Sequence, residues 1–255
     1  MKVYCRFRPL NSRELATAGH KVCCQFPNSK TVTLMGINAK TGQHEPVPYN
    51  YDQVYDMNCT QKQIYDKTVS PIVDSVLNGY NGTILTYGQT GSGKTHTMTG
   101  EDIENEETRG IIPRMISGFF KQIAAQPEDT EFSIKVSFVE IYNEKIKDLL
   151  DPRKSDLKIH ENKQLGVHVA GMTESYVGSE QEVYQILKVG NENRSIGATN
   201  MNKQSSRSHS VFILQVEQKN ISDFSSKTGK IYLVDLAGSE RISKTGAEGN
   251  TLTEA

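Results

Sequence analysis

The octapeptide at residues 88–95, Gly-Gln-Thr-Gly-Ser-Gly-Lys-Thr, constrains this chain more than any other stretch. It has the form G-x-x-x-x-G-K-T, in which the glycines allow a tight turn whose successive backbone N–H groups point inward. Such a cradle accepts phosphate oxygens, while Lys94 supplies a positive charge for the β- and γ-phosphates and the Thr95 hydroxyl can bind Mg²⁺. The pattern predicts a phosphate-binding loop. A glycine-rich turn without a ligand is the alternative.

The sequence on either side of the loop supports the phosphate-binding interpretation. Residues 83–87, Thr-Ile-Leu-Thr-Tyr, are apolar and β-branched and predict a buried strand. Residues 96–98 can continue a helix whose N-terminal dipole faces the phosphates. Strand, loop and helix therefore follow one another in the order that the motif needs.

The composition of the chain is that of a soluble globular protein. Its 255 residues, 36% hydrophobic and 23% charged, suit one large domain or two small ones. We find no secretory signal, and no run approaches the roughly 18 apolar residues of a membrane span. The four cysteines lack CxxC spacing, which favours reduced thiols inside the cell over a zinc site. A net charge of -1 gives no general indication of nucleic-acid binding, so any acidic partner would have to meet local basic patches.

Hydrophobic periodicity predicts the main elements. Apolar or alternating runs predict strands at residues 2–7, 31–35, 131–140, 211–216 and 230–235. Helical spacing predicts helices at residues 61–77, 110–123 and 180–194, the first of them bent or divided by Pro71 and ended by Asn78-Gly79. Short β-like runs between residues 21 and 56 predict a small antiparallel lobe, and the acidic residues 101–107 predict a solvated loop. The order favours an α/β fold with helices on both faces of a central sheet.

A phosphate-binding loop of this kind needs a carboxylate near Mg²⁺ and an element that senses the γ-phosphate. Asp235 ends an apolar strand, where its carboxylate can steady the water shell of the metal. Gly238 lies three residues further on and can offer a bare backbone N–H to the γ-phosphate. This D-x-x-G pattern is weak alone, but it follows a phosphate-binding loop and an apolar strand.

The stretch at residues 200–209 is unusually dense in hydroxyl groups for a connector. Its serines, Ser205, Ser206 and Ser208, can bind Mg²⁺ or orient water, and Arg207 can stabilise transferring charge. The spacing leaves an alternative open, in which this stretch is a polar turn and Arg207 forms a surface ion pair.

Three motifs stand together in the chain: residues 88–95, Asn202-Lys-Gln-Ser-Ser-Arg-Ser-His209 and Asp235-Leu-Ala-Gly-Ser-Glu240. This set, in this order, resembles the kinesin motor domain. Further matches to the family are Arg6-Phe-Arg-Pro9, Gly79-Tyr-Asn-Gly-Thr83, Glu140-Ile-Tyr-Asn-Glu144 and Asp148-Leu-Leu150. The resemblance runs from Lys2 to Ala255, and residues 243–249 most resemble the kinesin-1 (conventional kinesin) class.

The resemblance implies a P-loop NTPase fold and a microtubule-stimulated ATPase, with ATP or ADP and Mg²⁺ as cofactors. The implied nucleotide-binding residues are Arg6, Arg8, Pro9, Gly88, Gln89, Thr90, Gly91, Ser92, Gly93, Lys94, Thr95 and His96. The implied catalytic residues are Ser205, Ser206, Arg207, Gly238 and Glu240. Arg207 and Glu240 would pair over the γ-phosphate, and Glu240 would relay a proton from the attacking water through a second water. Thr95, Ser206 and, through water, Asp235 would hold the Mg²⁺.

The resemblance also implies a partner, the microtubule (tubulin), and a place in the cytoplasm on the cytoskeleton. Its implied contacts are Arg153, Lys154, Lys158, Arg241 and Lys244, because local positive charge steers association with an acidic surface. A solvated surface remains the alternative for these residues. No nucleic-acid partner is implied, and any dimer would form through segments that the sequence does not contain.

Relative to the family, residues 1–255 form one motor domain that stops at the start of the switch II helix, so we expect the sequence to be part of a longer chain. A microtubule-based motor is the leading interpretation. One alternative is a nucleotide-binding, microtubule-binding module that has lost turnover, and another is a P-loop ATPase with a different partner. The catalytic positions matched above are intact, which favours the motor.

Overall fold

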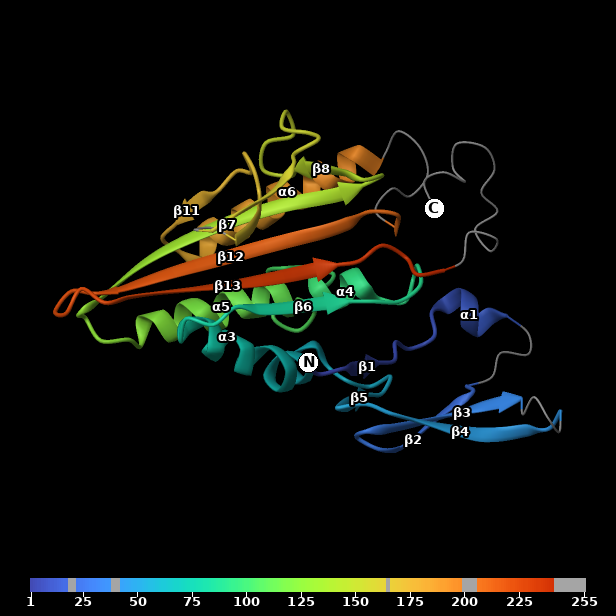
Figure 1. Cartoon of the computed structure of the whole chain (residues 1–255). Coiled ribbons are helices and arrows are strands. Elements are labelled where there is room, and N and C mark those ends of the chain that lie inside the picture. The colour runs from blue at the N-terminus through green and yellow to red at the C-terminus, as the bar shows by residue number, and fades with distance from the viewer. Residues whose placement is uncertain (18–21, 38–41, 164–165, 199–205, 241–255) are drawn as a thin grey trace. The chain divides into compact units, whose positions relative to one another are not determined.

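The computed structural model describes residues 1–17, 22–37, 42–163, 166–198 and 206–240 of the chain. They belong to two compact units, Met1–Ile64 and Tyr65–Ala255, which are coloured along the chain in Figure 1. We call them unit 1 and unit 2.

Unit 1 contains two small sheets. In the first, β1 (Tyr4–Arg6) pairs in parallel with β5 (Gln53–Tyr55). In the second, β2 (Cys24–Asn28), β3 (Thr31–Ile37) and β4 (His44–Asn50) form an antiparallel sheet in that order. The predicted first strand and the predicted antiparallel lobe are therefore confirmed. Two short helices, α1 (Ser12–Ala16) and α2 (Gln61–Ile64), complete the described part of this unit.

A mixed sheet forms the centre of unit 2. Its strand order is β11 (Ser175–Val177), β7 (Thr130–Tyr142), β12 (His209–Asn220), β13 (Ser226–Asp235) and β6 (Gly82–Thr86), and β8 (Lys145–Asp148) also pairs with β7. Strands β7, β12 and β13 are antiparallel, whereas β6 runs parallel to β13 (Figure 1). The predicted strands are present, but β12 and β13 are longer than predicted. They also form a hairpin, which we did not predict.

The predicted helix at residues 61–77 is divided, as the proline indicated. The helix α2 ends at Ile64, a π-helical segment η1 follows (Tyr65–Val69), and α3 spans Ser70–Leu77 with Pro71 in its first turn. Proline is tolerated there because the first N–H groups of a helix have no partner within the helix. Asn78 is the C-cap of α3, and Gly79 follows with a φ of 88°, as predicted.

The remaining helices of unit 2 are α4 (Lys94–Met98), α5 (Ile111–Ala124) and α6 (Glu180–Ala198). All three were predicted, but the helix predicted at residues 180–194 is four residues shorter than the observed α6. The helical spacing of apolar residues in α5 buries Ile112, Met115, Ile116 and Phe119. In α6, Val183 and Leu187 are buried, whereas Val189 is exposed. Among the described residues, no helix combines the length and apolar character needed to cross a membrane.

The long helices pack on one face of the sheet. Side chains of α3 approach Gly82 of β6, and α3 also contacts β13. Gly190 of α6 lies directly against Phe138. Phe138 in turn contacts Phe212 edge to face, with ring centroids 5.5 Å apart. Helix α5 contacts both α3 and α6. The α/β fold with a central sheet is confirmed, but these three helices share a single face, whereas we had expected helices on both.

Strand β6 corrects one prediction. The strand that leads into the phosphate-binding loop is present, but it is not buried: Leu85 is 57% exposed. The reason is its place in the sheet. Within the described part of unit 2, β6 is the last strand in the order and pairs only with β13. An apolar run alone does not distinguish a central strand from such an edge strand.

Candidate functional site

The loop between β6 and α4 has the backbone conformation that its glycines predict. Gly91 and Gly93 have φ values of 77° and 95°, in the left-handed region that favours glycine. A Cβ atom added to either would meet nothing within 4 Å. Glycine is therefore favoured here by the backbone conformation and not by steric crowding. The space beside these two residues is open. Gly93 is the N-cap of α4, so the loop runs straight into the helix.

Lys94, the first residue of α4, folds back over the loop. Its Nζ donates hydrogen bonds to the backbone oxygens of Gly88 at 2.8 Å and Gln89 at 3.1 Å. Partial burial lowers the pKa of Lys94, although the nearby carboxylates of Asp235 and Glu240 act in the opposite direction. The ammonium group is thus held at the loop by oxygens, as a phosphate would hold it.

The carboxylate of Asp235 joins the end of β13 to the loop. Its Oδ2 accepts a hydrogen bond of 2.7 Å from the Thr95 hydroxyl, and its Oδ1 accepts one of 3.2 Å from Thr86. Asp235 is buried. The structure therefore brings together Thr95 and Asp235, two of the residues predicted from the sequence for the metal site.

A buried arginine, Arg194 of α6, also contacts Asp235, and we did not predict it. Its Nη1 lies 3.2 Å from Asp235 Oδ2 and donates to Ser210 Oγ at 3.0 Å. Its Nε lies 3.7 Å from Oε1 of the buried Glu140. A signal was present in the sequence, because Arg194 follows Val183, Leu187 and Gly190 at helical spacing on the core face of α6. A cation at a core position needs carboxylate partners.

The segment after β13 is tied to its surroundings by backbone hydrogen bonds. Gly238 N donates to Ser206 O at 2.8 Å, Ser239 N donates to Gly88 O at 3.2 Å, and Ala237 N donates to His209 Nδ1 at 3.1 Å. The segment thus lies against both the loop and the hydroxyl-rich stretch. A Cβ atom on Gly238 would overlap the Thr90 hydroxyl and the Glu240 carboxylate, so a larger residue there would require these side chains to move. The predicted contact of Gly238 N with a γ-phosphate stays a prediction.

Glu240 reaches the loop through Thr90. Its Oε2 accepts a hydrogen bond of 2.8 Å from Thr90 N, and its Oε1 accepts another from the Thr90 hydroxyl. These bonds lower the pKa of Glu240. In the predicted ion pair, the Glu240 carboxylate would contact Arg207 and not Thr90. That ion pair stays a prediction. Of the serines, Ser206 is partly buried and Ser208 fully buried, whereas Ser205 lies outside the described residues.

The residues expected at the adenine lie in unit 1, apart from His96. Arg6 donates to Gln61 Oε1 at 2.9 Å, and Arg8 forms a two-bond ion pair with Glu14, while Pro9 is exposed. Glu14 also completes the capping box of α1 with Asn11. Both arginines therefore have side-chain partners within unit 1. His96 of α4 in unit 2 lies 3.8 Å from Glu101.

The predicted basic run is partly neutralised by its own acidic residues. Arg153 is 90% exposed on its side chain and pairs with Asp151 at 2.8 Å. Lys158 pairs with Asp156 at 2.8 Å, and Lys154 donates to the Thr173 hydroxyl at 3.0 Å. Arg241 and Lys244 lie outside the described residues. The aspartates stand two residues before the cations that they neutralise, a pattern visible in the sequence.

The residues at the loop fit a magnesium ion. Mg²⁺ prefers oxygen ligands and usually keeps several waters, binding through one or two carboxylates and the phosphates of a nucleotide. The Thr95 hydroxyl and the Asp235 carboxylate are such oxygens and lie 2.7 Å apart. The described residues hold no group of three or more His, Cys, Asp or Glu side chains arranged around a metal.

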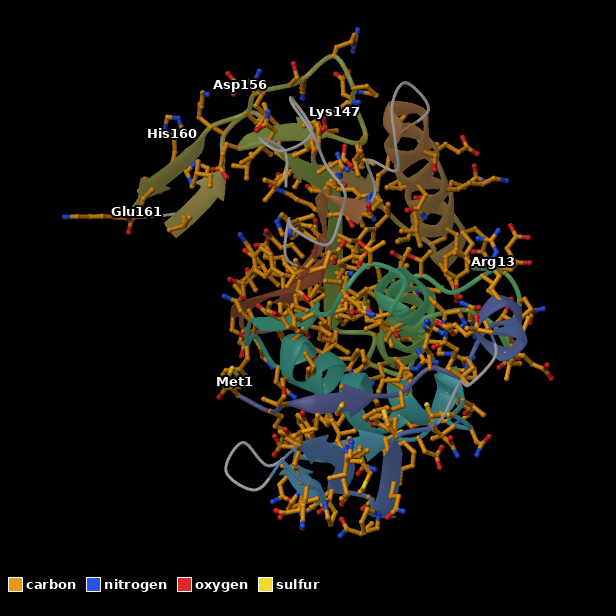
Figure 2. The ribbon with its side chains drawn as sticks, turned by 90° about the vertical axis from the view of Figure 1, so that its right-hand side faces the viewer. Met1, Arg13, Lys147, Asp156, His160 and Glu161 are labelled. Carbon is orange, nitrogen blue, oxygen red and sulfur yellow. The ribbon has the colours of Figure 1, made fainter. Side chains whose placement is uncertain are left out.

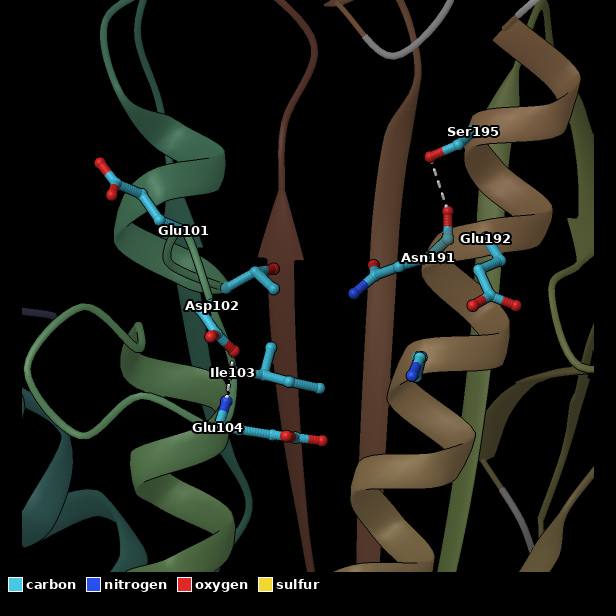
Figure 3. Close-up of a pocket in the computed structure, with 9 residues that line it drawn as sticks. Glu101, Asp102, Ile103, Glu104, Asn191, Glu192 and Ser195 are labelled. Carbon is cyan, nitrogen blue, oxygen red and sulfur yellow. Dashed lines mark hydrogen bonds between the residues drawn. The ribbon is translucent and has the colours of Figure 1, made fainter.

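The acidic residues 101–107 form the loop that we predicted, and this loop lines a pocket against α6. The cavity has a volume of about 760 Å³. Figure 3 shows Glu101, Asp102, Ile103 and Glu104 on one side, with Asn191, Glu192 and Ser195 of α6 on the other. Arg114 fixes the far part of the acidic loop by donating to the backbone oxygens of Glu106 and Arg109.

A glycine-rich loop between a strand and a helix, with a carboxylate from a neighbouring strand on its threonine, defines a P-loop nucleotide-binding domain. A model of the kinesin motor domain family matches residues 6–255, and the chain belongs to this family. The resemblance found in the sequence is confirmed.

Relatives and a solved structure agree with this assignment. The chain is 49% identical over 255 residues to a kinesin heavy chain of Syncephalastrum racemosum and 48% identical over 255 residues to one of Drosophila melanogaster. It covers 27% and 25% of these relatives, whereas all of this chain is matched. The structure superposes with a TM-score of 0.91 on that of a fast kinesin, at 44% identity, over all of this chain and 70% of the other. The names of these relatives agree with the predicted kinesin-1 class.

Proposed function

We propose that residues 1–255 belong to the motor domain of a microtubule-based motor, which couples hydrolysis of Mg-ATP to microtubule binding and movement. The observation that carries the proposal is that the segment 235–240 is hydrogen-bonded to the loop at residues 88–95. Asp235 accepts a hydrogen bond from Thr95, and Glu240 accepts one from Thr90. The similarity to kinesin heavy chains supports it. The similar solved structure, of a fast kinesin, is described as bearing on the ATPase mechanism of that protein and on its interactions with microtubules.

In this proposal the backbone of residues 88–95 binds the phosphates, and Lys94 neutralises their charge. Thr95, Ser206 and, through water, Asp235 hold Mg²⁺, which would neutralise charge on the phosphate oxygens. Arg6, Arg8, Pro9 and His96 contact the adenine side of the nucleotide. Because Lys94 already bonds two oxygens of its own loop, a bound phosphate would replace those contacts.

Turnover requires Glu240 to change partners. In the described arrangement, Thr90 holds both carboxylate oxygens of Glu240. For hydrolysis, Glu240 leaves Thr90 and pairs with Arg207 over the γ-phosphate, where it accepts a proton through water. Ser205 and Gly238 complete the site around the γ-phosphate. Hydrolysis is thereby coupled to the position of the segment that follows β13.

The partner surface contains Arg153, Lys154 and Lys158, together with Arg241 and Lys244. Tubulin, the acidic partner implied by the resemblance, would attract the exposed cations of this surface. Such a motor would act in the cytoplasm on the cytoskeleton. Any dimer would form through segments outside these residues.

The proposal is tested by measuring ATP hydrolysis with and without polymerised tubulin. We expect turnover to rise by roughly an order of magnitude or more with microtubules, a change of about 1.4 kcal/mol in the activation barrier. Lys94→Ala is the control that weakens nucleotide binding while leaving the basic surface unchanged. A co-pelleting assay with microtubules identifies the partner.

Two other outcomes would overturn the motor proposal. Co-pelleting without stimulated turnover would favour a nucleotide-binding module that binds microtubules. Turnover without co-pelleting would favour a P-loop ATPase that acts on another partner.

A further inference from the structure

A two-stranded hairpin in unit 2 carries two histidines that the proposed function does not use. Strand β9 (Ile159–Asn162) pairs antiparallel with β10 (Gly166–Val169), and His160 stands directly opposite His168. In Figure 2 the side chains of His160 and Glu161 project from this hairpin. His160 is exposed and His168 partly exposed, so both rings are open to solvent.

The two imidazole rings lie on the same face of the hairpin. Residues directly opposite one another in an antiparallel pair have Cβ atoms about 4.5–5.5 Å apart on one face. The ring centroids of His160 and His168 are 6.3 Å apart with an interplanar angle of 41°. Small side-chain rotations can therefore aim one nitrogen of each ring at a common point between them.

The hydrogen bond of His168 orients its ring for such a role. Its Nδ1 lies 3.1 Å from Gly166 O, an acceptor, so in a neutral ring Nδ1 carries the proton. Nε2 then keeps its lone pair. Histidines that bind metals commonly donate the other ring N–H to a carbonyl or carboxylate, which fixes the tautomer and the ring orientation.

We propose that His160 and His168 form a two-imidazole binding site for a divalent transition-metal ion, of which Zn²⁺ and Ni²⁺ are the expected types. Imidazole nitrogen suits these ions, with a metal–nitrogen distance of about 2.0–2.1 Å for zinc. The two rings supply two ligands, and water supplies the others on this open surface. Mg²⁺, which prefers oxygen ligands, does not compete.

The charges around the pair are compatible with a cation. The nearest preceding cation in the sequence, Lys158, is neutralised by Asp156 at 2.8 Å. Glu161 follows His160 on β9 and pairs with Val167, so its carboxylate leaves from the opposite face and adds negative charge without blocking the rings. The next cation along the sequence, Lys163, comes directly after β9.

The test uses the untagged chain in excess Mg²⁺ and follows Ni²⁺ and Zn²⁺ binding by calorimetry, with retention on an immobilised Ni²⁺ resin as a second readout. We expect one metal ion per chain at this site. His160→Gln and His168→Gln should each weaken binding by about tenfold or more, which corresponds to about 1.4 kcal/mol. His44→Gln is the matched control: it removes an exposed histidine of β4 and should leave binding unchanged.

Circular dichroism checks that each variant folds, and both histidines are accessible enough that the fold should be kept. Equal binding by the wild-type chain and the two hairpin variants would overturn the proposal. So would a loss of binding in His44→Gln as large as that in the hairpin variants. Absence of measurable binding to the wild-type chain would overturn it as well.

Discussion

The hydroxyl of Thr95 donates a hydrogen bond of 2.7 Å to Oδ2 of Asp235, a residue 140 positions further along the chain. The bond connects the first turn of α4 with the carboxyl end of β13. Arg194 contacts the same oxygen from α6 at 3.2 Å. Helix, sheet and loop therefore meet at one carboxylate, and this carboxylate serves both the stability of unit 2 and the proposed metal site.

Asp235→Asn should destabilise the protein and weaken binding of Mg-nucleotide. Removing one partner of a buried ion pair costs about 3 kcal/mol, because the other charge stays buried without its partner. We expect a loss of that size in the free energy of unfolding, measured by urea denaturation. Glu217→Gln, which changes an exposed carboxylate on β12, should change it by less than about 0.5 kcal/mol. Equal stability of the two variants would contradict this role.

Glu240→Gln should separate nucleotide binding from turnover. Glutamine can still accept from Thr90 but cannot take up a proton, so we expect turnover to fall by about 10²–10⁴-fold with nucleotide affinity nearly kept. Lys94→Ala should instead weaken nucleotide binding. The measurements are fluorescent-nucleotide binding and steady-state ATP hydrolysis. An equal loss of affinity in both variants would show that the assigned roles are wrong.

Gly190→Ala should destabilise unit 2, although the same change stabilises an exposed helix by about 1 kcal/mol. A Cβ atom on Gly190 would overlap the ring of Phe138 beneath α6. Overpacking of this kind costs about 1–3 kcal/mol. Urea denaturation would measure the change, with Ser195→Ala on the exposed side of α6 as the matched control. Ser195→Ala should be neutral or slightly stabilising, and a stabilised Gly190→Ala would contradict the close packing.

Glu14 should make stability depend on pH in the acidic range. Its bonds with Arg8 and Asn11 lower the pKa of its carboxyl from 4.5 to about 2. Because the folded pKa is the lower one, the stabilisation is present above about pH 4.5 and is lost as pH falls toward about 2. The difference in unfolding midpoint between wild type and Glu14→Gln should therefore shrink over this window. Arg8→Gln should move the Glu14 carboxyl titration, followed by NMR, back toward 4.5.

Asp156→Asn should strengthen the proposed binding to microtubules. Asp156 has a φ of 60°, a conformation that asparagine tolerates, so the change removes the charge that neutralises Lys158 while keeping the backbone. We expect a few-fold tighter binding in co-pelleting at low salt, with the difference shrinking as salt screens the charges. Lys158→Gln should act in the opposite direction. Weaker binding by Asp156→Asn would argue against a role for Lys158.

The loop and the elements with strong local patterns could be predicted from the sequence. The glycines of residues 88–95 carry their own backbone conformation, and the periodicity of α5 and β7 is visible over more than ten residues. The division of the helix at residues 61–77 followed from one proline. The site residues in the loop, and Asp235, could be predicted because a phosphate-binding loop needs a carboxylate near Mg²⁺.

Other features depend on contacts that no local pattern records. The exposure of Leu85 follows from the position of β6 in the strand order, which is set by pairing with a strand far along the chain. By contrast, the neutralisation of Arg153 and Lys158 follows a local pattern that we did not use, an aspartate two residues before each cation. Arg194 was missed because its partners, Glu140 and Asp235, come from two different strands.

The parallel pairing of β6 with β13 has a consequence for the order in which this protein can fold. Thr86 and Asp235, which face one another in this pair, are 149 positions apart. In a chain synthesised from its N-terminus, the phosphate loop leaves the ribosome long before its carboxylate does. Contacts of such long range form late, because the loop between them must close first. A nucleotide can therefore bind this loop tightly only once β13 is in place. Its binding stabilises the completed fold and does not assist the early folding steps.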